Sequence, residues 1–254
     1  MKFLRYYYNN EISYGILKKD CENKITKIEG SPFIGFKESS EELDFKDVKV
    51  LTPCNFTKAV CVGLNYRDHA KEFNHPIPES PVLFIKPATT ALGMYENILK
   101  PQMCKRLDYE AELAIVIKSK AHDIEEEDAH KYILGYTCAN DVTARDLQPQ
   151  KGQWTLAKSF DTFCPFGPFI ETKIDPTNLK ITSILNEKVM QESNTSNLIF
   201  NPFYLVSYIS KVMTLNPGDI ILTGTPSGVS HMKDLSTISI KIEGIGTLTN
   251  TVKY

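Results

Sequence analysis

Alternating apolar and polar positions recur along this chain of 254 residues, and they predict a β-rich protein. Near the N-terminus this alternation covers residues 3–8, 12–16 and 25–28, with turns between them. A charged, Ser-rich stretch at 38–44 predicts a connector, and a strand-like pattern resumes at 48–53. We therefore place a boundary near residue 50. The predicted domains are a small N-terminal β domain (1–50) and a main domain (51–254).

In the main domain, strand signals outnumber helix signals. The predicted strands are 59–62, 82–85, 111–117, 220–223 and 238–242. They are rich in β-branched residues, and the last of them alternates apolar and polar positions. The core is therefore expected to be β-rich.

Two helices are marked by their first residues. Asp123 with Glu126 three residues later predicts a reciprocal cap. Asn201-Pro202 predicts the start of the other helix. The spacing of its apolar positions predicts a stripe that packs into the core, formed by Leu205, Ile209, Val212 and Met213.

Composition narrows the class of protein. The chain is 42% hydrophobic with a net charge of -2, and its pI is about 6.2. We expect no binding to nucleic acid or to a membrane surface, because the chain has no long-range positive field and no run of Lys or Arg. No stretch approaches the roughly 20 apolar residues of a membrane span, and no signal sequence is apparent. A cytoplasmic protein with scattered, reduced cysteines is expected.

Three carboxylates in two short phrases are the strongest chemical signal. Glu110 and Glu112 adjoin the apolar run 113–117, and residues two apart in a strand point to the same face. Asp141 follows in Ala-Asn-Asp-Val-Thr. Carboxylates held close together repel, and Mg²⁺ or Mn²⁺ removes that conflict. When the two glutamates are taken alone, a solvated acidic strand face is the better explanation, and the rest of the chain shifts the balance toward a metal.

Other polar residues are candidates with simpler alternatives. His69 and Glu72 lie three apart after the strand 59–62, where they form either a base oriented by a carboxylate or an ordinary surface pair. Lys158 lies among apolar and aromatic residues and needs an anionic partner unless it reaches solvent. The turn at Thr225 could bind an anion, or it could simply require glycine.

Five phrases, in order, resemble the fumarylacetoacetate hydrolase (FAH) superfamily, and the resemblance covers about residues 52–254. They are Gly-Leu-Asn-Tyr-Arg-Asp-His-Ala-Lys-Glu (63–72), Pro-Val-Leu-Phe-Ile-Lys-Pro (81–87), Asp-Tyr-Glu-Ala-Glu-Leu-Ala (108–114), Asn-Asp-Val-Thr-Ala-Arg-Asp-Leu-Gln with Ala-Lys-Ser-Phe-Asp (140–148 and 157–161), and Leu-Thr-Gly-Thr-Pro-Ser-Gly (222–228). Within that superfamily, the chain resembles the bacterial acylpyruvase and 2-hydroxyhepta-diene-dioate isomerase branch.

This resemblance implies an α+β, β-rich fold: a mixed β-sandwich roll of the FAH type with a small N-terminal β domain. It implies a homodimer and a Mg²⁺ or Mn²⁺ cofactor. The implied metal ligands are Glu110, Glu112 and Asp141. The implied catalytic residues are His69, Glu72 and Lys158, and the implied substrate-binding residues are Gln148 and Thr225. Arg145 lies in the same phrase, but no contact is assigned to it.

The function expected from the resemblance is hydrolysis of a C–C bond in a β-diketo, acylpyruvate-type 2-oxo acid through a metal-stabilised enolate. His69, held by Glu72, would activate water, and Lys158 would stabilise developing charge. The same enolate serves isomerisation of 2-hydroxy-diene-dioates and tautomerisation or decarboxylation of oxaloacetate, which are the alternatives. A non-catalytic β-rich binding protein is a more remote alternative. A zinc protein is disfavoured, because the histidines are dispersed and the cysteines unpaired.

Overall fold

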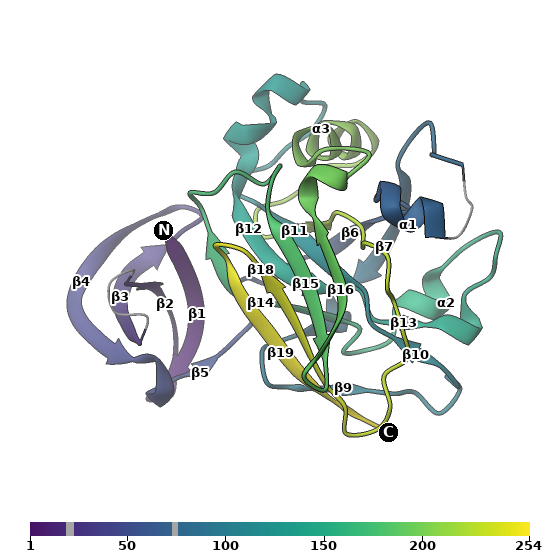
Figure 1. Ribbon diagram of the computed structural model, residues 1–254. Coiled ribbons are helices and arrows are strands. Elements are labelled where there is room, and N and C mark those ends of the chain that lie inside the picture. Colours follow the sequence, from purple (N-terminus) through teal and green to yellow (C-terminus); the bar gives the residue numbers. More distant parts are fainter. Residues whose placement is uncertain (19–22, 73–75) are drawn as a thin grey trace.

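Strands dominate the structure, a computed structural model that describes residues 1–18, 23–72 and 76–254, without the side chains of His69, Ala70 and Glu72. Strands account for 46% of the chain and helices for 15%. The β-rich fold with mixed sheets and a small N-terminal β unit is confirmed (Figure 1).

The largest sheet in the described part of the chain has twelve strands. Ten follow the order β4-β3-β2-β1-β14-β12-β11-β17-β6-β7, with β5 paired to β1 and β8 paired to β14. Their bounds are Lys2–Tyr8 (β1), Glu11–Leu17 (β2), Lys24–Ser31 (β3), Gly35–Asp44 (β4), Lys49–Val50 (β5), Lys58–Gly63 (β6), Val82–Pro87 (β7), Ala91–Leu92 (β8), Ala111–Ile117 (β11), Ile133–Asn140 (β12), Cys164–Glu171 (β14) and Ile220–Leu222 (β17). All five strands predicted for the main domain are present.

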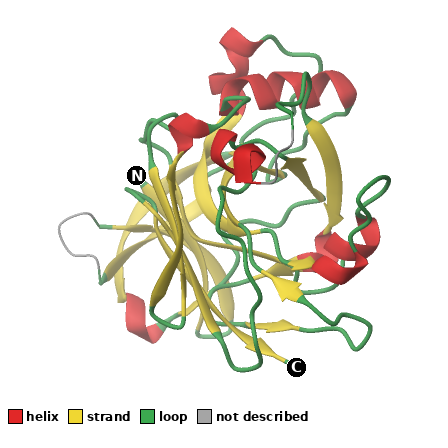
Figure 2. Cartoon of the chain, turned by 45° about the vertical axis from the view of Figure 1, so that its right-hand side comes forward, coloured by secondary structure: helices red, strands yellow, loops and turns green. Residues whose placement is uncertain are grey.

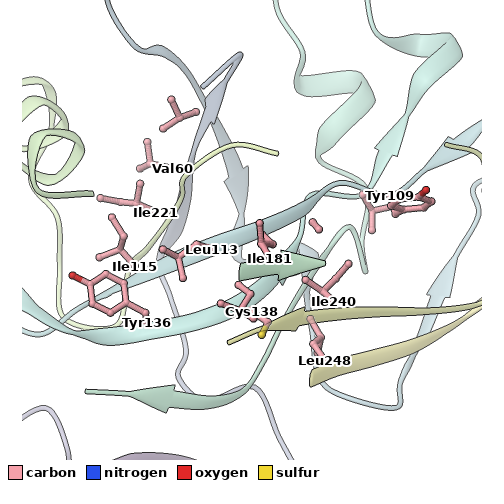
Figure 3. Close-up of a cluster of buried hydrophobic side chains, with 14 of the residues drawn as sticks. Val60, Tyr109, Leu113, Ile115, Tyr136, Cys138, Ile181, Ile221, Ile240 and Leu248 are labelled. Atoms are coloured by element: carbon pink, nitrogen blue, oxygen red, sulfur yellow. The ribbon is translucent and has the colours of Figure 1, made fainter. Parts of the chain in front are cut away.

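A five-stranded sheet packs against the middle of the large one. It has the order β16-β15-β18-β19-β9, and β10 with β13 forms a separate pair. The bounds are Asn97–Leu99 (β9), Leu107–Asp108 (β10), Thr143–Ala144 (β13), Lys180–Leu185 (β15), Lys188–Asn194 (β16), Thr237–Ile242 (β18) and Gly246–Lys253 (β19). Figure 3 shows Leu113 and Cys138 of the large sheet close to Ile181, Ile240 and Leu248 of the smaller one. This buried layer fixes β11 and β12, from which the candidate site is built.

The N-terminal strands continue the large sheet, because β1 pairs antiparallel with β14. The prediction of a connector at 38–44 is wrong, because these residues form most of β4. Their polar side chains suit an exposed edge strand, and cross-strand ion pairs such as Lys24–Asp44 (3.0 Å) and Lys27–Glu41 (3.2 Å) offset the charge. The domain boundary near residue 50 stays a prediction.

Helices are short and lie outside the sheets (Figure 2). The α-helices are Arg67–Glu72 (α1), Thr155–Lys158 (α2) and Pro202–Val212 (α3). The 3₁₀ helices are Phe45–Asp47 (η1), Ala88–Thr90 (η2), Glu126–Tyr132 (η3), Arg145–Leu147 (η4) and Thr195–Asn197 (η5). No helix in the described ranges is long and apolar enough to cross a bilayer.

The start of α3 is as predicted, because the Asn201 side chain accepts hydrogen bonds from the backbone N–H groups of Phe203 and Tyr204, both 2.9 Å long. The predicted apolar stripe is only partly correct. Leu205 and Ile209 are buried, but Val212 is 59% exposed because the helix ends there.

The reciprocal cap predicted at Asp123 is wrong. Asp123 has a positive φ of 49°, and the 3₁₀ helix η3 begins three residues later without a side-chain cap. Contacts with α3 override the local signal: the Asp123 N–H donates to the Ser210 carbonyl and the Ile124 N–H donates to the Ser210 hydroxyl, each at 3.0 Å. α3 and η3 pack together at the top of Figure 1.

Five cysteines are buried free thiols, namely Cys54, Cys61, Cys104, Cys138 and Cys164. The sixth, Cys21, lies outside the described residues. Burial raises the pKa of the Cys138 and Cys164 thiols to about 12. These thiols are therefore protonated packing groups near neutral pH.

Asp219 joins the start of β17 to the start of β6. Its fully buried carboxylate accepts hydrogen bonds from the Thr57 N–H (2.9 Å), the Thr57 hydroxyl (2.7 Å) and the Asn216 N–H (2.9 Å), and it pairs with the Lys58 ammonium. Burial opposes the charge, but the Lys58 ammonium and these donors hold the pKa of Asp219 below its ordinary value.

The Asp219 carboxylate therefore makes stability depend on acid pH. The pKa of Asp219 is lower in the folded chain than in the unfolded chain, so the unfolded chain takes up a proton at this carboxylate first as the pH falls. The stabilisation from Asp219 is therefore fully present above the unfolded pKa and is lost as the pH falls through the folded pKa. Asp219→Asn should lower the free energy of unfolding by about 1.5–3 kcal/mol at pH 7. The free energy of unfolding of this variant should also fall less steeply between pH 7 and pH 3 than that of the wild type. Urea unfolding from pH 7 to pH 3 measures both effects. An equal decrease in the free energy of unfolding with falling pH for the two proteins would contradict this assignment.

Candidate metal centre

Pairing between β11 and β12 brings the three predicted metal ligands together. Ala111 lies opposite Asn140, the Asp141 N–H donates to the Glu110 carbonyl (2.9 Å), and the Glu110 N–H donates to the Asn140 side-chain oxygen (3.0 Å). Glu110 and Asp141 are therefore neighbours across the end of this ladder. One carboxylate oxygen from each of Glu110, Glu112 and Asp141 lies within 4.8 Å of the others.

Burial makes this carboxylate cluster electrostatically demanding. Glu110, Glu112 and Asp141 are 6%, 2% and 1% exposed. Burial, followed by the charges of Asp141 and Glu110, raises the pKa of Glu112 well above its ordinary value. Glu112 accepts a 2.6 Å hydrogen bond from the Gly224 N–H, which only partly offsets these effects. Without a further cation, the third carboxylate tends to take up a proton.

Lys158 supplies one of the compensating charges. Its ammonium lies 2.8 Å from Glu110 Oε2 and 2.6 Å from Asp141 Oδ2. Burial alone would lower the pKa of Lys158, but the Asp141 and Glu110 carboxylates raise it. The side chain is 2% exposed, so it does not reach solvent. The anionic partners that the sequence requires for Lys158 are thus two of the predicted metal ligands.

Arg145 binds the second carboxylate oxygen of Glu110. Its guanidinium bonds Glu110 Oε1 and the Gln148 side-chain oxygen, both at 2.5 Å, and Asp108 Oδ2 at 2.9 Å. Burial disfavours the charge of Glu110, yet the charges of Lys158 and Arg145 hold the pKa of Glu110 well below its usual range. Sequence reasoning assigned no contact to Arg145 and did not single out Asp108. Gln148 is therefore linked to the carboxylate of Glu110 indirectly, because Arg145 donates to both side chains.

Lys86 is a site residue that sequence reasoning missed. It is fully buried in β7, and its ammonium donates to the carbonyls of Val142 (3.0 Å), Lys158 (2.7 Å) and Phe163 (2.7 Å). The same nitrogen lies 2.6 Å from Asp141 Oδ1. Lys86 thereby joins three separate segments beside the carboxylates. A lysine directly after the apolar run Val-Leu-Phe-Ile was the available signal.

Gln191 is a second missed residue, and it explains the position of Thr225. Its side-chain oxygen accepts from the Ala111 N–H (3.0 Å), between the two glutamates, and its side-chain nitrogen donates to the Thr225 hydroxyl and the Pro226 carbonyl (both 2.8 Å). Gln191 is fully buried. The turn after β17 is therefore tied directly to the start of β11, next to Glu112.

The predicted catalytic pair is only partly visible. The backbone of His69 and Glu72 belongs to α1, in agreement with the predicted helical turn, but both side chains lie outside the described residues. Asn65, two residues before the start of α1, is well fixed: its side chain donates to the Thr223 carbonyl (2.7 Å) and accepts from the Phe200 N–H (2.8 Å). The roles of His69 and Glu72 stay predictions.

The carboxylate cluster fits a hard divalent cation. Asp141 Oδ1 is buried beside the Lys86 ammonium at 2.6 Å, but that ammonium directs its hydrogen bonds at three backbone carbonyls, so the oxygen accepts no hydrogen bond of ordinary geometry within the described ranges. The donor atoms are all carboxylate oxygens, which Mg²⁺ and Mn²⁺ prefer. A doubly charged cation would also remove the repulsion that raises the pKa of Glu112. Glu110, Glu112 and Asp141 are therefore the residues that would hold it.

The fold and this cluster agree with comparisons to known proteins. Residues 58–253 match the model of the fumarylacetoacetate (FAA) hydrolase C-terminal family, and residues 1–53 match the Rv2993c-like N-terminal family. The chain belongs to the fumarylacetoacetate hydrolase family. The resemblance inferred from the five phrases is thus confirmed.

Several of the more similar named relatives are isomerases and tautomerases, and a fumarylacetoacetate hydrolase from Exiguobacterium antarcticum is 32% identical with a TM-score of 0.89, covering 100% of this chain and 99% of that one. The structure of a 5-carboxymethyl-2-hydroxymuconate delta-isomerase from Mycobacterium smegmatis is 40% identical and has a TM-score of 0.93, covering 100% of this chain and 99% of that one. A 2-hydroxyhepta-2,4-diene-1,7-dioate isomerase from Mycobacterium marinum is 40% identical with a TM-score of 0.92, covering 100% and 98%. The oxaloacetate tautomerase FAHD2A, mitochondrial, of Bos taurus is 44% identical over 77% of this chain and 66% of that protein.

These names support the alternatives of isomerisation and tautomerisation better than the hydrolysis expected first.

Proposed function

We propose that this chain is a divalent-metal-dependent isomerase or tautomerase of small 2-oxo acids, including 2-hydroxy-diene-dioates and oxaloacetate. The buried cluster of Glu110, Glu112 and Asp141 is the observation that carries the proposal. The isomerase and tautomerase relatives indicate the reaction class. When bound, Mg²⁺ or Mn²⁺ would act as a Lewis acid on the keto oxygen of the substrate.

The residues around the cluster suit proton transfer next to a carbonyl. In tautomerisation a proton leaves the carbon adjacent to the keto group and a proton is added to the oxygen, so no atoms are gained or lost. Lys158 is a buried, charged donor that can stabilise the negative charge on that oxygen or protonate it. Arg145 keeps Glu110 charged and oriented. Gln148 and Thr225 remain the candidates for holding the rest of the substrate.

Hydrolysis makes a further demand on the site. An attacking water needs a positioned base, and the candidates His69 and Glu72 have side chains outside the described residues. The same two residues could equally carry a proton during isomerisation. We therefore treat C–C cleavage as an outcome that the assay must distinguish.

A substrate panel with and without Mg²⁺ separates these reactions. The panel contains oxaloacetate, a 2-hydroxy-diene-dioate, acetylpyruvate and fumarylpyruvate, followed by ultraviolet absorbance of the enol and by pyruvate release. We expect EDTA-sensitive interconversion of tautomers or isomers without pyruvate release. Faster pyruvate release from an acylpyruvate would identify a hydrolase. No turnover, together with no change in melting temperature on adding Mg²⁺, would support a binding protein.

A homodimer in the cytoplasm remains part of this proposal. The bovine relative is named as mitochondrial. Light scattering after size-exclusion chromatography would give the mass of the particle. A mass of one chain would contradict the dimer.

A further inference from the structure

Lys158 occupies the space between two candidate metal ligands. Its ammonium contacts Glu110 Oε2 at 2.8 Å and Asp141 Oδ2 at 2.6 Å, and it lies 5.1 Å from the centre of the Phe84 ring. Trp154 packs edge-on against Phe84, with ring centres 5.3 Å apart. This singly charged group thus lies against two of the three carboxylates that would bind a divalent ion.

The neighbouring cations are held differently. Lys86 directs its hydrogen bonds at three backbone carbonyls, so its position does not depend on the carboxylates alone. Arg145 binds the other oxygen of that carboxylate, Glu110 Oε1, and is also paired with Asp108. Among the described contacts, the hydrogen bonds of the Lys158 ammonium go only to Glu110 and Asp141. Lys158 is therefore the cation whose position depends most on the state of these two carboxylates.

We propose that Lys158 is an internal counter-ion, which holds the carboxylate oxygens of the metal-free site and is displaced from them by the divalent ion. This inference rests on the metal site of the proposed function. An ammonium and a divalent cation repel at contact distance, and both would draw on the carboxylates of Glu110 and Asp141, so both cannot keep their best positions. Displacement would release the Lys158 ammonium toward the substrate only when the metal is present.

If Lys158 competes with the metal ion for the carboxylates, removing Lys158 should change the metal affinity in the opposite direction from removing a residue that supports the site. Removing a supporting residue weakens metal binding, whereas removing a competitor strengthens it. Lys158→Met and Lys158→Gln should therefore bind Mn²⁺ about tenfold more tightly than the wild type, or better, although turnover falls. Calorimetric titration of the EDTA-treated full chain measures the affinity. Equal or weaker binding by both variants would overturn the proposal.

Arg145→Gln is the matched control, because it also removes one positive charge next to Glu110. Arg145 contacts only Glu110 among the three candidate ligands and is also paired with Asp108, so this variant should bind Mn²⁺ no more tightly than the wild type. Equal tightening in Arg145→Gln and Lys158→Met would indicate a general charge effect and would overturn direct competition. Absence of Mn²⁺ binding in all of these proteins, the wild type included, would instead refute the metal site itself.

The wild-type chain provides a test that does not depend on a variant that folds. In ¹⁵N-lysine spectra of the metal-free protein, the buried ammonium groups of Lys86 and Lys158 should give two signals protected from solvent exchange. Adding Mg²⁺ should remove the Lys158 signal and leave that of Lys86. Two protected signals at saturating Mg²⁺ would contradict displacement.

Discussion

Glu112→Gln should abolish metal-dependent turnover while leaving the metal-free protein as stable as the wild type, or more stable. The contacts of Glu112 explain this combination. The described contacts tie Glu110 and Asp141 to Lys158, Arg145 and Lys86, whereas Glu112 accepts from a backbone N–H. Its neutral replacement leaves no cation unpaired and removes a like-charge repulsion. The same replacement removes one charged ligand of the metal.

The expected effect of Glu112→Gln on turnover is a loss of about 10²–10³-fold or more. Melting temperatures with EDTA and with Mg²⁺, measured beside steady-state rates, test both halves of the prediction. Glu127→Gln, at an exposed position, is the control and should behave as the wild type. Metal-dependent stabilisation that survives in Glu112→Gln would contradict the assignment of this ligand.

Lys86→Met should destabilise the folded chain more than Asp219→Asn or Glu112→Gln does. Three carbonyls would lose their shared donor, and Asp141 would lose a cation 2.6 Å from its Oδ1 atom. Removing one partner of a buried ion pair costs about 3–5 kcal/mol. For a chain of this size the melting temperature should fall by roughly 6–20 °C.

The control for Lys86→Met is Lys241→Met, on an exposed position of β18. A surface substitution of this kind usually changes stability by about 0.5 kcal/mol or less. Chemical denaturation of both variants, in EDTA, measures the difference without a contribution from metal. If the two variants unfold at the same denaturant concentration, Lys86 does not hold the site together.

The carboxylate cluster could be predicted because its signal is local. Glu110 and Glu112 adjoin one strand, Asp141 follows the strand that pairs with it, and the phrases around them carry the family resemblance. Lys86 and Gln191 could not be predicted in the same way. The hydrogen-bond partners of Lys86 are 56 to 77 residues away, and Gln191 reaches Ala111 across 80 residues. Backbone partners at such distances leave no pattern in the sequence.

Two wrong predictions about the fold have a similar cause. The stretch 38–44 was predicted to be a connector because it is polar, but an edge strand can expose polar side chains and still pair on its other side. Asp123 has the residue type and spacing of a cap, but hydrogen bonds to Ser210 of α3 hold its backbone in another conformation. In both cases tertiary contacts decided the local structure.

The central claim is that Glu110, Glu112 and Asp141 bind one divalent cation. Anomalous diffraction from crystals of the wild-type chain grown with Mn²⁺ tests it most directly. We predict one strong anomalous peak per chain, within bonding distance of an oxygen of each of these three side chains. A map without a peak there, with Lys158 still in contact with Glu110 and Asp141 at saturating Mn²⁺, would contradict it.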